Sequence, residues 1–287
     1  QYTDRTRNMA DAADSGESWR TDLFDIPGYL DAIGVRPAEP SLELLEAVHF
    51  AHVHTFPFAN VDVLLGTHPG VSPDAVHDQL VRRRRGGYCF EHAQMFAAAL
   101  EYLGFSVRRS LGRVHDVSNT RTHMTVIVQL GGRRWLCDPG FGYSISRPIA
   151  TEAGATRVEG GREFSVDRVD DDGSVLWVLK RDGEVQHYQD ELTVHPADAR
   201  AGHFFTSRHE DSPFTQHLMV MRHMPDAHIT VTEAAQTVRV PGQDSVHTRL
   251  SVDEVVAAVQ ELGVSLAAGE DERLAAVVRG LRRAQER

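Results

Sequence analysis

Residues 123–138 read HMTVIVQLGGRRWLCD, in which a glycine pair separates two runs rich in β-branched and aromatic residues. Such a pair between two strands is typical of a two-residue β-hairpin turn. A two-residue turn at Gly131-Gly132 pairs Leu130 with Arg133 and, further along the strands, Thr125 with Asp138. Because side chains alternate along a strand, His123 lies on the same face, diagonal to Asp138. Cys137 then lies on the opposite face. The segment therefore predicts a hairpin that holds an imidazole beside a carboxylate.

Upstream, Cys89 follows Gly86, Gly87 and Tyr88 at the start of a run with helical spacing. A thiol at a helix N-terminus meets unpaired N–H groups and the positive end of the helix dipole, and both favour the nucleophilic thiolate. Taken alone, Cys89 also fits an ordinary small buried residue.

A cysteine at a helix start together with a histidine and an aspartate on one hairpin face is the Cys–His–Asp arrangement of thiol acyl transfer. Taken separately, His123 also fits a strand histidine and Asp138 a cap of the turn that follows it. Their joint occurrence favours Cys89, His123 and Asp138 as catalytic residues.

Helical spacing precedes Gly104, and strand spacing follows it. Ser41 caps a helix that runs at least to Phe50, Ser72-Pro73 precedes a helix at 75–81, and a third helix runs from Cys89 to Leu103. Strands are predicted at 105–113, 124–130, 134–138, 164–169 and 175–180, and helical spacing returns from 251 to 287.

The composition excludes several classes of protein. The 287 residues include 30 Lys+Arg against 41 Asp+Glu, a net charge of −11, which argues against a nucleic-acid binder. No apolar run approaches the roughly 18–20 residues that cross a bilayer, so we expect no membrane span. Residues 1–20 are polar and predict a flexible leader without a signal-peptide core. Because only two cysteines occur, a reducing cytoplasm is the expected location.

These motifs resemble those of the arylamine N-acetyltransferase family. The match runs in order from about Asp22 to Arg222 and weakens in the last third of the chain. The matching segments are Arg85-Gly86-Gly87-Tyr88-Cys89 (nucleophile), His123-Met124-Thr125 (histidine), Asp138-Pro139-Gly140-Phe141-Gly142 (aspartate turn), Phe56-Pro57-Phe58-Ala59-Asn60-Val61-Asp62, and Thr206-Ser207 through Asp211-Ser212-Pro213-Phe214.

The resemblance implies an α+β fold in three parts. A helical bundle bearing the cysteine is expected at 21–104, a β-barrel bearing His and Asp at 105–210, and an α/β lid at 211–287. The cysteine helix packed on a β-barrel is similar to the core of papain-like and transglutaminase-like enzymes.

The resemblance also implies an acetyltransferase that uses acetyl-CoA as a co-substrate, with no permanently bound cofactor and no metal. The acetyl group would pass through a thioester on Cys89 to an aromatic amine or hydrazine. Besides the catalytic three, we expect substrate contacts from Phe58, Thr125, Phe141, Gly142, Phe204 and Phe205, and structural roles near the site for Arg85, Gly86 and Gly87. Each of these phenylalanines also fits a core position.

Two departures from the family pattern matter. Ala59 stands where the family usually has a glutamate, which is expected to pair with the arginine matched here by Arg85. Arg85 must therefore find another carboxylate or stay solvated. Pro139 replaces a small aliphatic residue and favours an extended conformation at Asp138.

Three other readings stay open. The first is an amide synthase of the same family, which closes a macrolactam on a carrier-bound polyketide. The second is a papain-like hydrolase, although the papain cysteine signature is missing. The third is a binding protein without catalysis.

A metal site at His49, His52 and His54 lacks a second cluster of ligands. The acceptor, acyl-chain preference, CoA contacts and oligomeric state are left undetermined, with a homodimer as one arrangement.

Overall fold

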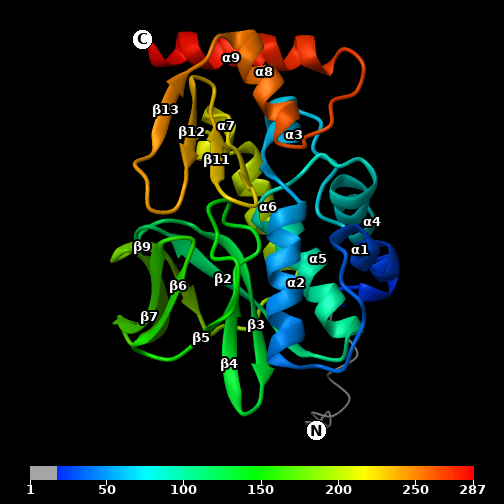
Figure 1. Ribbon diagram of the computed structural model, residues 1–287, viewed down its shortest axis with the longest axis vertical. Coiled ribbons are helices and arrows are strands. Elements are labelled where there is room, and N and C mark those ends of the chain that lie inside the picture. The colour runs from blue at the N-terminus through cyan, green and yellow to red at the C-terminus, as the bar shows by residue number, and fades with distance from the viewer. Residues whose placement is uncertain (1–17) are drawn as a thin grey trace, which may run out of the picture.

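The structure, a computed structural model, describes residues 18–287, so the leader predicted at 1–20 falls almost wholly outside the described residues. Helices of the first third pack beside an eight-stranded sheet, and a five-stranded sheet with two helices lies at one end of the molecule (Figure 1). Within the described part, no helix has the length and apolar character needed to span a membrane. The predicted α+β class is confirmed, and the three domain boundaries remain a prediction.

Three helices dominate the first third: α1 (Ile26–Ile33), α2 (Leu42–Thr55) and α5 (Cys89–Tyr102). Ser41 caps α2 by accepting a hydrogen bond from Leu44 N, as predicted. The α5 helix is buried along nearly its whole length because it lies between the other helices and the sheet. Shorter elements connect these helices: η2 (Thr21–Leu23), β1 (Phe58–Ala59), α3 (Val61–Leu64), α4 (Pro73–His77) and the wider π-turn η3 (Asp78–Arg82).

The helix predicted at 75–81 is confirmed: α4 forms its first part, and the chain continues as the wider π-helix η3. Within η3, Gln79 O accepts a hydrogen bond from Arg85 N at 2.8 Å, and Gln79 Nε2 donates to Gly86 O at 3.0 Å. These contacts join the end of the helix to the loop that follows.

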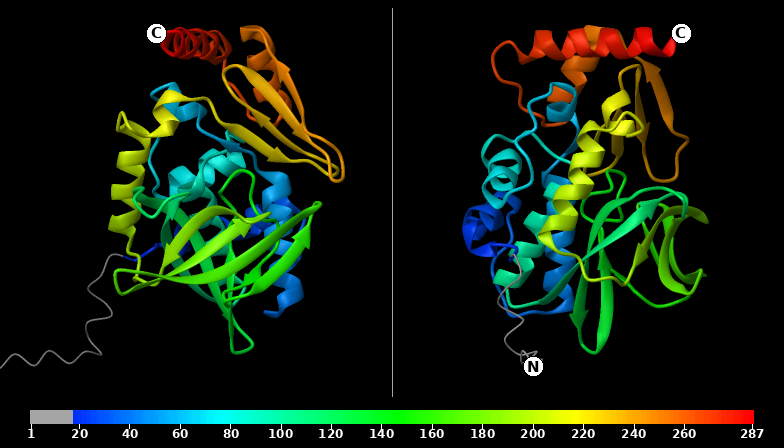
Figure 2. Two further views of the ribbon diagram at one scale, coloured as in Figure 1. Left: turned by 90° about the vertical axis from the view of Figure 1, so that its left-hand side faces the viewer. Right: turned by 180° about the vertical axis from the view of Figure 1, so that it is seen from behind.

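The eight-stranded sheet is antiparallel and curls into a barrel-like shape (Figure 2). The predicted hairpin is confirmed, with pairs running from Leu130–Arg133 to Val126–Cys137. The strands, in sheet order, are β5 (Ile149–Ala150), β4 (Arg133–Cys137), β3 (Arg121–Leu130), β2 (Ser106–Val114), β9 (Glu184–Asp190), β8 (Ser174–Arg181), β7 (Arg162–Asp171) and β6 (Ala155–Glu159).

The second sheet joins distant parts of the chain, because β1 pairs with β10 through Phe58–Met221 and Ala59–Val220. Two amphipathic helices, α8 and α9, cover this sheet with a core of their own. The remaining elements are α6 (Pro196–Arg208), α7 (Pro213–Gln216), β10 (Val220–His223), β11 (His228–Val231), β12 (Ala235–Arg239), β13 (Val246–Arg249), α8 (Val252–Glu261) and α9 (Glu270–Gln285).

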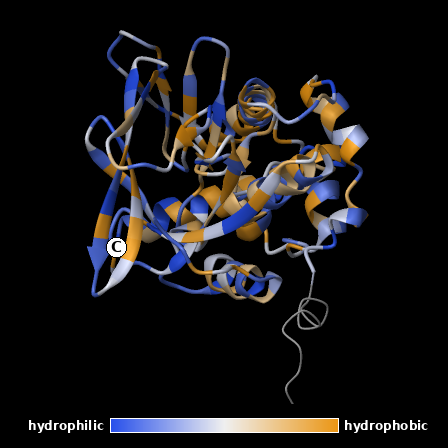
Figure 3. Cartoon of the chain, turned by 90° about the horizontal axis from the view of Figure 1, so that it is seen from below, coloured by the Kyte–Doolittle hydropathy of each residue, from blue (hydrophilic) through white to orange (hydrophobic). Residues whose placement is uncertain are grey.

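The largest core cluster joins the helical part to the barrel. Phe90 and Phe96 of α5 pack in one cluster with Met124, Val126 and Cys137 of the predicted hairpin. Hydrophobic and hydrophilic residues are interspersed along the barrel strands (Figure 3). The hairpin buries both faces, because Ile127 and Leu136 pack in a second cluster with residues of β7 and β8. Its other face, which carries Cys137, lies against the cysteine helix and fixes the position of both.

Candidate active site

Cys89 is the first residue of α5, as the sequence predicts. Its Sγ lies 3.3 Å from Thr122 O, so the side chain is directed toward strand β3, next to His123. The turn before it requires glycine. Gly86 has a φ of +73°, and a Cβ at this position would lie 2.7 Å from Pro57 O.

His123 and Asp138 meet in the barrel next to this helix start. His123 Nε2 lies 3.1 Å from Asp138 Oδ1, and both side chains are buried. The other carboxylate oxygen, Oδ2, lies 2.8 Å from Nε2 of His187 on β9. Each oxygen of the carboxylate thus binds one imidazole, and the structure brings Cys89, His123 and Asp138 together as predicted from sequence.

The charges of this group follow from its contacts. Burial alone would lower the pKa of His123, but the Asp138 carboxylate, helped by a hydrogen bond with the Cys89 side chain, outweighs burial and raises that pKa to about 10. Burial opposes ionisation of Asp138 as well, yet His123 and His187 hold its pKa well below the ordinary value. Burial lowers the pKa of His187. The arrangement is an imidazolium and a neutral imidazole sharing one carboxylate.

A chain of hydrogen bonds supports the carboxylate from behind. Thr125 Oγ1 donates to Gln189 Oε1 at 3.0 Å, and Gln189 Nε2 donates to His187 Nδ1 at 3.1 Å. The second nitrogen of His187 therefore carries its proton and donates it to Asp138. Thr125 does bond within this group, whereas sequence reasoning missed His187 and Gln189 because nothing in the sequence indicated that their strand pairs with β2.

Cys137 lies in the apolar cluster on the opposite face of the hairpin. Burial and then the neighbouring Asp138 charge raise the pKa of its thiol well above the ordinary value. This thiol is therefore a poor nucleophile, in agreement with the sequence argument.

Two of the four predicted phenylalanines lie near this group. Phe141 meets the His123 ring edge-on, with centroids 5.2 Å apart. Phe58 packs against Phe214, with centroids 5.9 Å apart, and a Cβ on Gly142 would lie 3.3 Å from the Phe58 ring. Phe214 adds an aromatic side chain that the sequence argument did not single out.

The other two of the four predicted phenylalanines lie on α6, away from this group. Phe204 is 62% exposed and sits beneath the Arg208 guanidinium, and the Phe205 ring stacks on His209, with centroids 4.5 Å apart. The structure shows neither ring in contact with the Cys89, His123 and Asp138 side chains.

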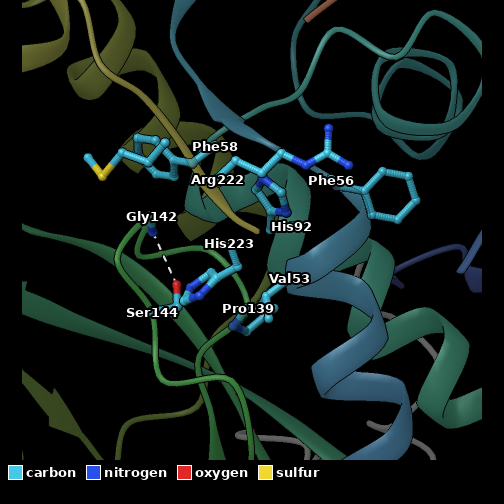
Figure 4. Close-up of a pocket in the computed structure, with 10 residues that line it drawn as sticks. Val53, Phe56, Phe58, His92, Pro139, Gly142, Ser144, Arg222 and His223 are labelled. Atoms are coloured by element: carbon cyan, nitrogen blue, oxygen red, sulfur yellow. Dashed lines mark hydrogen bonds between the residues drawn. The ribbon is translucent and has the colours of Figure 1, made fainter. Parts of the chain in front are cut away.

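A small pocket lies beside the turn that follows Asp138 (Figure 4). Pro139 and Gly142 face it, and Ser144 Oγ accepts a hydrogen bond from Gly142 N at 3.1 Å. The same turn packs tightly on α5, because a Cβ on Gly140 would lie 2.7 Å from the Cα of Cys89. The pocket is lined by Val53, Phe56, Phe58, His92, Pro139, Gly142, Ser144, Met221, Arg222 and His223.

The two options left open for Arg85 are resolved. Arg85 is buried, and its guanidinium forms ion pairs with Asp62 and with Glu270 of α9. It has found other carboxylates in place of the glutamate that Ala59 replaces.

Among residues 18–287, the only group with the donor spacing of a metal site is His123, Asp138 and His187, whose donor atoms lie within 4.8 Å of one another. Both imidazoles already bond the Asp138 carboxylate directly, at 3.1 and 2.8 Å, and these contacts favour proton chemistry. Of the histidines weighed as ligands, His52 bonds Tyr29 and His92, and His54 bonds Phe50 O.

Comparison with known proteins first defines the class. A family model described as N-acetyltransferase matches residues 41–270. The arylamine N-acetyltransferase of Escherichia coli K12 is 34% identical over 200 residues, which cover 66% of this chain and 69% of the relative.

Solved structures agree with this match. The arylamine N-acetyltransferase of Mycobacterium abscessus superposes with a TM-score of 0.86 at 29% identity, covering 91% of this chain and 97% of that one. The Mycobacterium marinum enzyme, solved in complex with CoA, gives 0.81 at 28% identity and covers 90% and 99%. The chain belongs to the arylamine N-acetyltransferase family.

Proposed function

We propose that this protein transfers an acetyl group from acetyl-CoA to the nitrogen of arylamines or arylhydrazines through a thioester on Cys89, in the cytoplasm. The observation that carries the proposal is the placement of Cys89 at the start of α5, beside an imidazolium that Asp138 orients at 3.1 Å. The names of the relatives and the CoA complex of the M. marinum protein support the choice of substrates.

In the first half-reaction, the Cys89 sulfur attacks the thioester carbonyl of acetyl-CoA. The His123 imidazolium balances the charge of the thiolate before attack. Backbone N–H groups at the start of α5 are suited to stabilise the oxyanion. When the carbonyl re-forms, the C–S bond to CoA breaks, His123 gives its proton to the leaving thiolate, and acetyl-Cys89 remains.

In the second half-reaction, the amine nitrogen attacks acetyl-Cys89. His123, neutral after the first half, removes the amine proton while Asp138 keeps the ring in one tautomer. The C–S bond breaks, and the amide leaves. The imidazolium and thiolate are then restored for the next cycle.

We assign the aromatic part of the acceptor to the rings nearest the reacting atoms. Phe141 packs on His123, and Phe58 with Phe214 forms an adjoining apolar wall beside Gly142. Phe204 and Phe205 are left out of this lining because their rings pack against Arg208 and His209 instead.

The decisive experiment is acetylation of a simple arylamine with free acetyl-CoA, combined with intact mass measurement. Wild-type protein should accumulate an acetyl adduct when the acceptor is withheld, and Cys89→Ala should form neither adduct nor product. Cys137→Ser, which alters the buried thiol, should stay nearly fully active. If Cys89→Ala kept a tenth of the rate or more, roughly, the thioester would not lie on the path.

A further inference from the structure

The loop that precedes the nucleophile contacts the C-terminal part of the chain, and the Arg85 side chain makes most of these contacts. Arg85 is 98% buried, and its Nε lies 3.1 Å from Asp62 Oδ1. Its Nη2 bonds the Glu270 carboxylate, and its Nη1 donates to Ser265 O at 2.6 Å. The two Nη atoms are therefore hydrogen-bonded, whereas Nε, which has no hydrogen-bond partner, faces Asp62 as an ion pair.

Two of these partners come from the far end of the sequence. Ser265 lies between α8 and α9, and Glu270 is the first residue of α9, 185 positions after Arg85. The same connection makes a main-chain contact, because Ser265 N donates to Arg84 O at 3.0 Å. Glu270 is itself oriented by Ala267 N, which donates to its carboxylate at 2.8 Å. A carboxylate in the first turn of a helix is also stabilised by the helix dipole.

The opposite side of the loop is fixed by main-chain contacts. Gly86 O accepts a hydrogen bond from Gln79, and Gly87 O accepts one from Ala59 N at 2.8 Å. His92, one turn into α5, also points its Nε2 at Gly87 O, at 3.1 Å. Residues 85–87 thus lie between β1 on one side and the α8–α9 connection on the other, two positions before the cysteine.

Burial makes the ion pairs matter. The Arg85, Asp62 and Glu270 side chains are 3%, 1% and 13% exposed, so water cannot replace a missing partner well. Asp62 is held independently, because Thr67 Oγ1 donates to its carboxylate at 3.1 Å. Ala59 offers no charge from β1. Glu270 is therefore the carboxylate that links the guanidinium to another part of the molecule.

We propose that Glu270 is a positioning residue for the nucleophile: through Arg85 it holds residues 85–87 in place and couples the C-terminal helix pair to Cys89. The proposal rests on the proposed role of Cys89. According to this proposal, α9, which begins 185 residues after Arg85, helps to orient the Cys89 sulfur.

The test compares Glu270→Gln with Glu272→Gln, a matched change at an exposed position on the same helix. Two quantities are measured: the rate at which iodoacetamide alkylates Cys89, and kcat for arylamine acetylation. We expect Glu270→Gln to lower both by between about ten- and a hundred-fold, in line with the cost of small misplacements of reacting groups. Glu272→Gln should leave both unchanged. Equal rates in Glu270→Gln and wild type would overturn the proposal.

A double-mutant cycle tests whether the effect passes through Arg85. If it does, Arg85→Met and Glu270→Gln together should slow alkylation no more than Arg85→Met alone. If the double variant instead slowed alkylation by the product of the two single effects, the two residues would act separately, and the proposal would be overturned. Cys137 serves as an internal monitor of folding, because it reacts only if the core opens. Alkylation of Cys137 in Glu270→Gln would show general unfolding and would also overturn a specific positioning role.

The outcome of this test can be distinguished from the outcome of the test of the proposed function. Activity in Cys89→Ala would remove the thioester pathway itself. An unchanged alkylation rate in Glu270→Gln would leave that pathway intact and remove only the coupling to α9.

Discussion

At the scale of single residues, the unexpected feature is that Asp138 serves two histidines. His123 faces the sulfur, while His187 lies behind the carboxylate and bonds its second oxygen at 2.8 Å. A carboxylate held at both oxygens cannot rotate away from His123. His187 therefore contributes to the orientation of His123, two contacts away from any substrate.

Replacing His187 with leucine should remove this support. We expect kcat for arylamine acetylation to fall about tenfold with little change in KM for the amine, because the loss affects the orientation of His123 and no substrate contact. Tyr188→Phe, at the neighbouring position on the other face of β9, is the control and should behave as wild type. A normal kcat in His187→Leu would show that His123 alone keeps Asp138 in place.

The charge on His123 provides a second residue-scale prediction. In wild-type protein the imidazole should stay protonated up to a pH of about 10, because Asp138 outweighs the effect of burial. Asp138→Asn removes that charge, so the pKa of His123 should fall and its titration move toward neutral pH. NMR of the His123 ring follows this directly, and turnover should drop by several orders of magnitude. An unshifted titration would mean that another group sets the charge of His123.

At the scale of elements, the sequence is informative where a local signal fixes the geometry. Gly131-Gly132 sets the hairpin register, and the register alone places His123 and Asp138 on one face. Strand β9 carries no such signal. Its inward side chains are the polar His187 and Gln189, so it lacks an apolar alternation, and its place depends on pairing with β2 and β8.

The sequence could not predict the ion-pair partner of Arg85 for a similar reason. Loss of the expected glutamate at Ala59 shows that a replacement is needed, but not where it lies. Glu270 becomes visible only once α9 packs beside α3 and the nucleophile loop. Contacts between distant segments decide both cases.

The turn after Asp138 offers an element-scale prediction. A Cβ on Gly140 would lie 2.7 Å from the Cα of Cys89 and 2.9 Å from the Cβ of His92, both rigid atoms of α5. Gly140→Ala should therefore push the turn off the helix, cost roughly 1–3 kcal/mol of unfolding free energy and lower kcat at least about tenfold. Gly280→Ala in α9 meets no atom within 4 Å and should raise stability slightly. Denaturant unfolding and turnover of both variants distinguish close packing from a general effect of the added methyl group.

At the scale of the whole molecule, histidines populate the core where the helices, the barrel and the second sheet meet. Burial lowers the pKa of His49 to about 4 and that of His228 to about 3, and it also lowers the pKa values of His52, His92, His187 and His223. Among the histidines of residues 18–287, only His123, held by Asp138, shifts strongly the other way. The fold therefore depends on keeping most of its buried imidazoles neutral.

These shifts predict unfolding in mild acid. A histidine whose pKa is lowered on folding stabilises the protein fully above the unfolded value of about 6.5, and this stability is lost as the pH falls, because the unfolded chain binds the proton first. At a pH of about 5, His49 and His228 alone should cost roughly 2 kcal/mol each, a large part of a typical 5–15 kcal/mol. The His123 contribution has the opposite sign: it is complete below about 6.5 and is lost as the pH rises toward 10. Stability should thus peak near neutral pH and fall steeply between about 6.5 and 5.

His49→Phe, which keeps a ring beside Phe96, should shift the acid midpoint of circular-dichroism unfolding downward, whereas His247→Gln on the exposed strand β13 should not. An unchanged midpoint in His49→Phe would mean that this imidazole is already protonated in the folded protein and that acid sensitivity arises elsewhere.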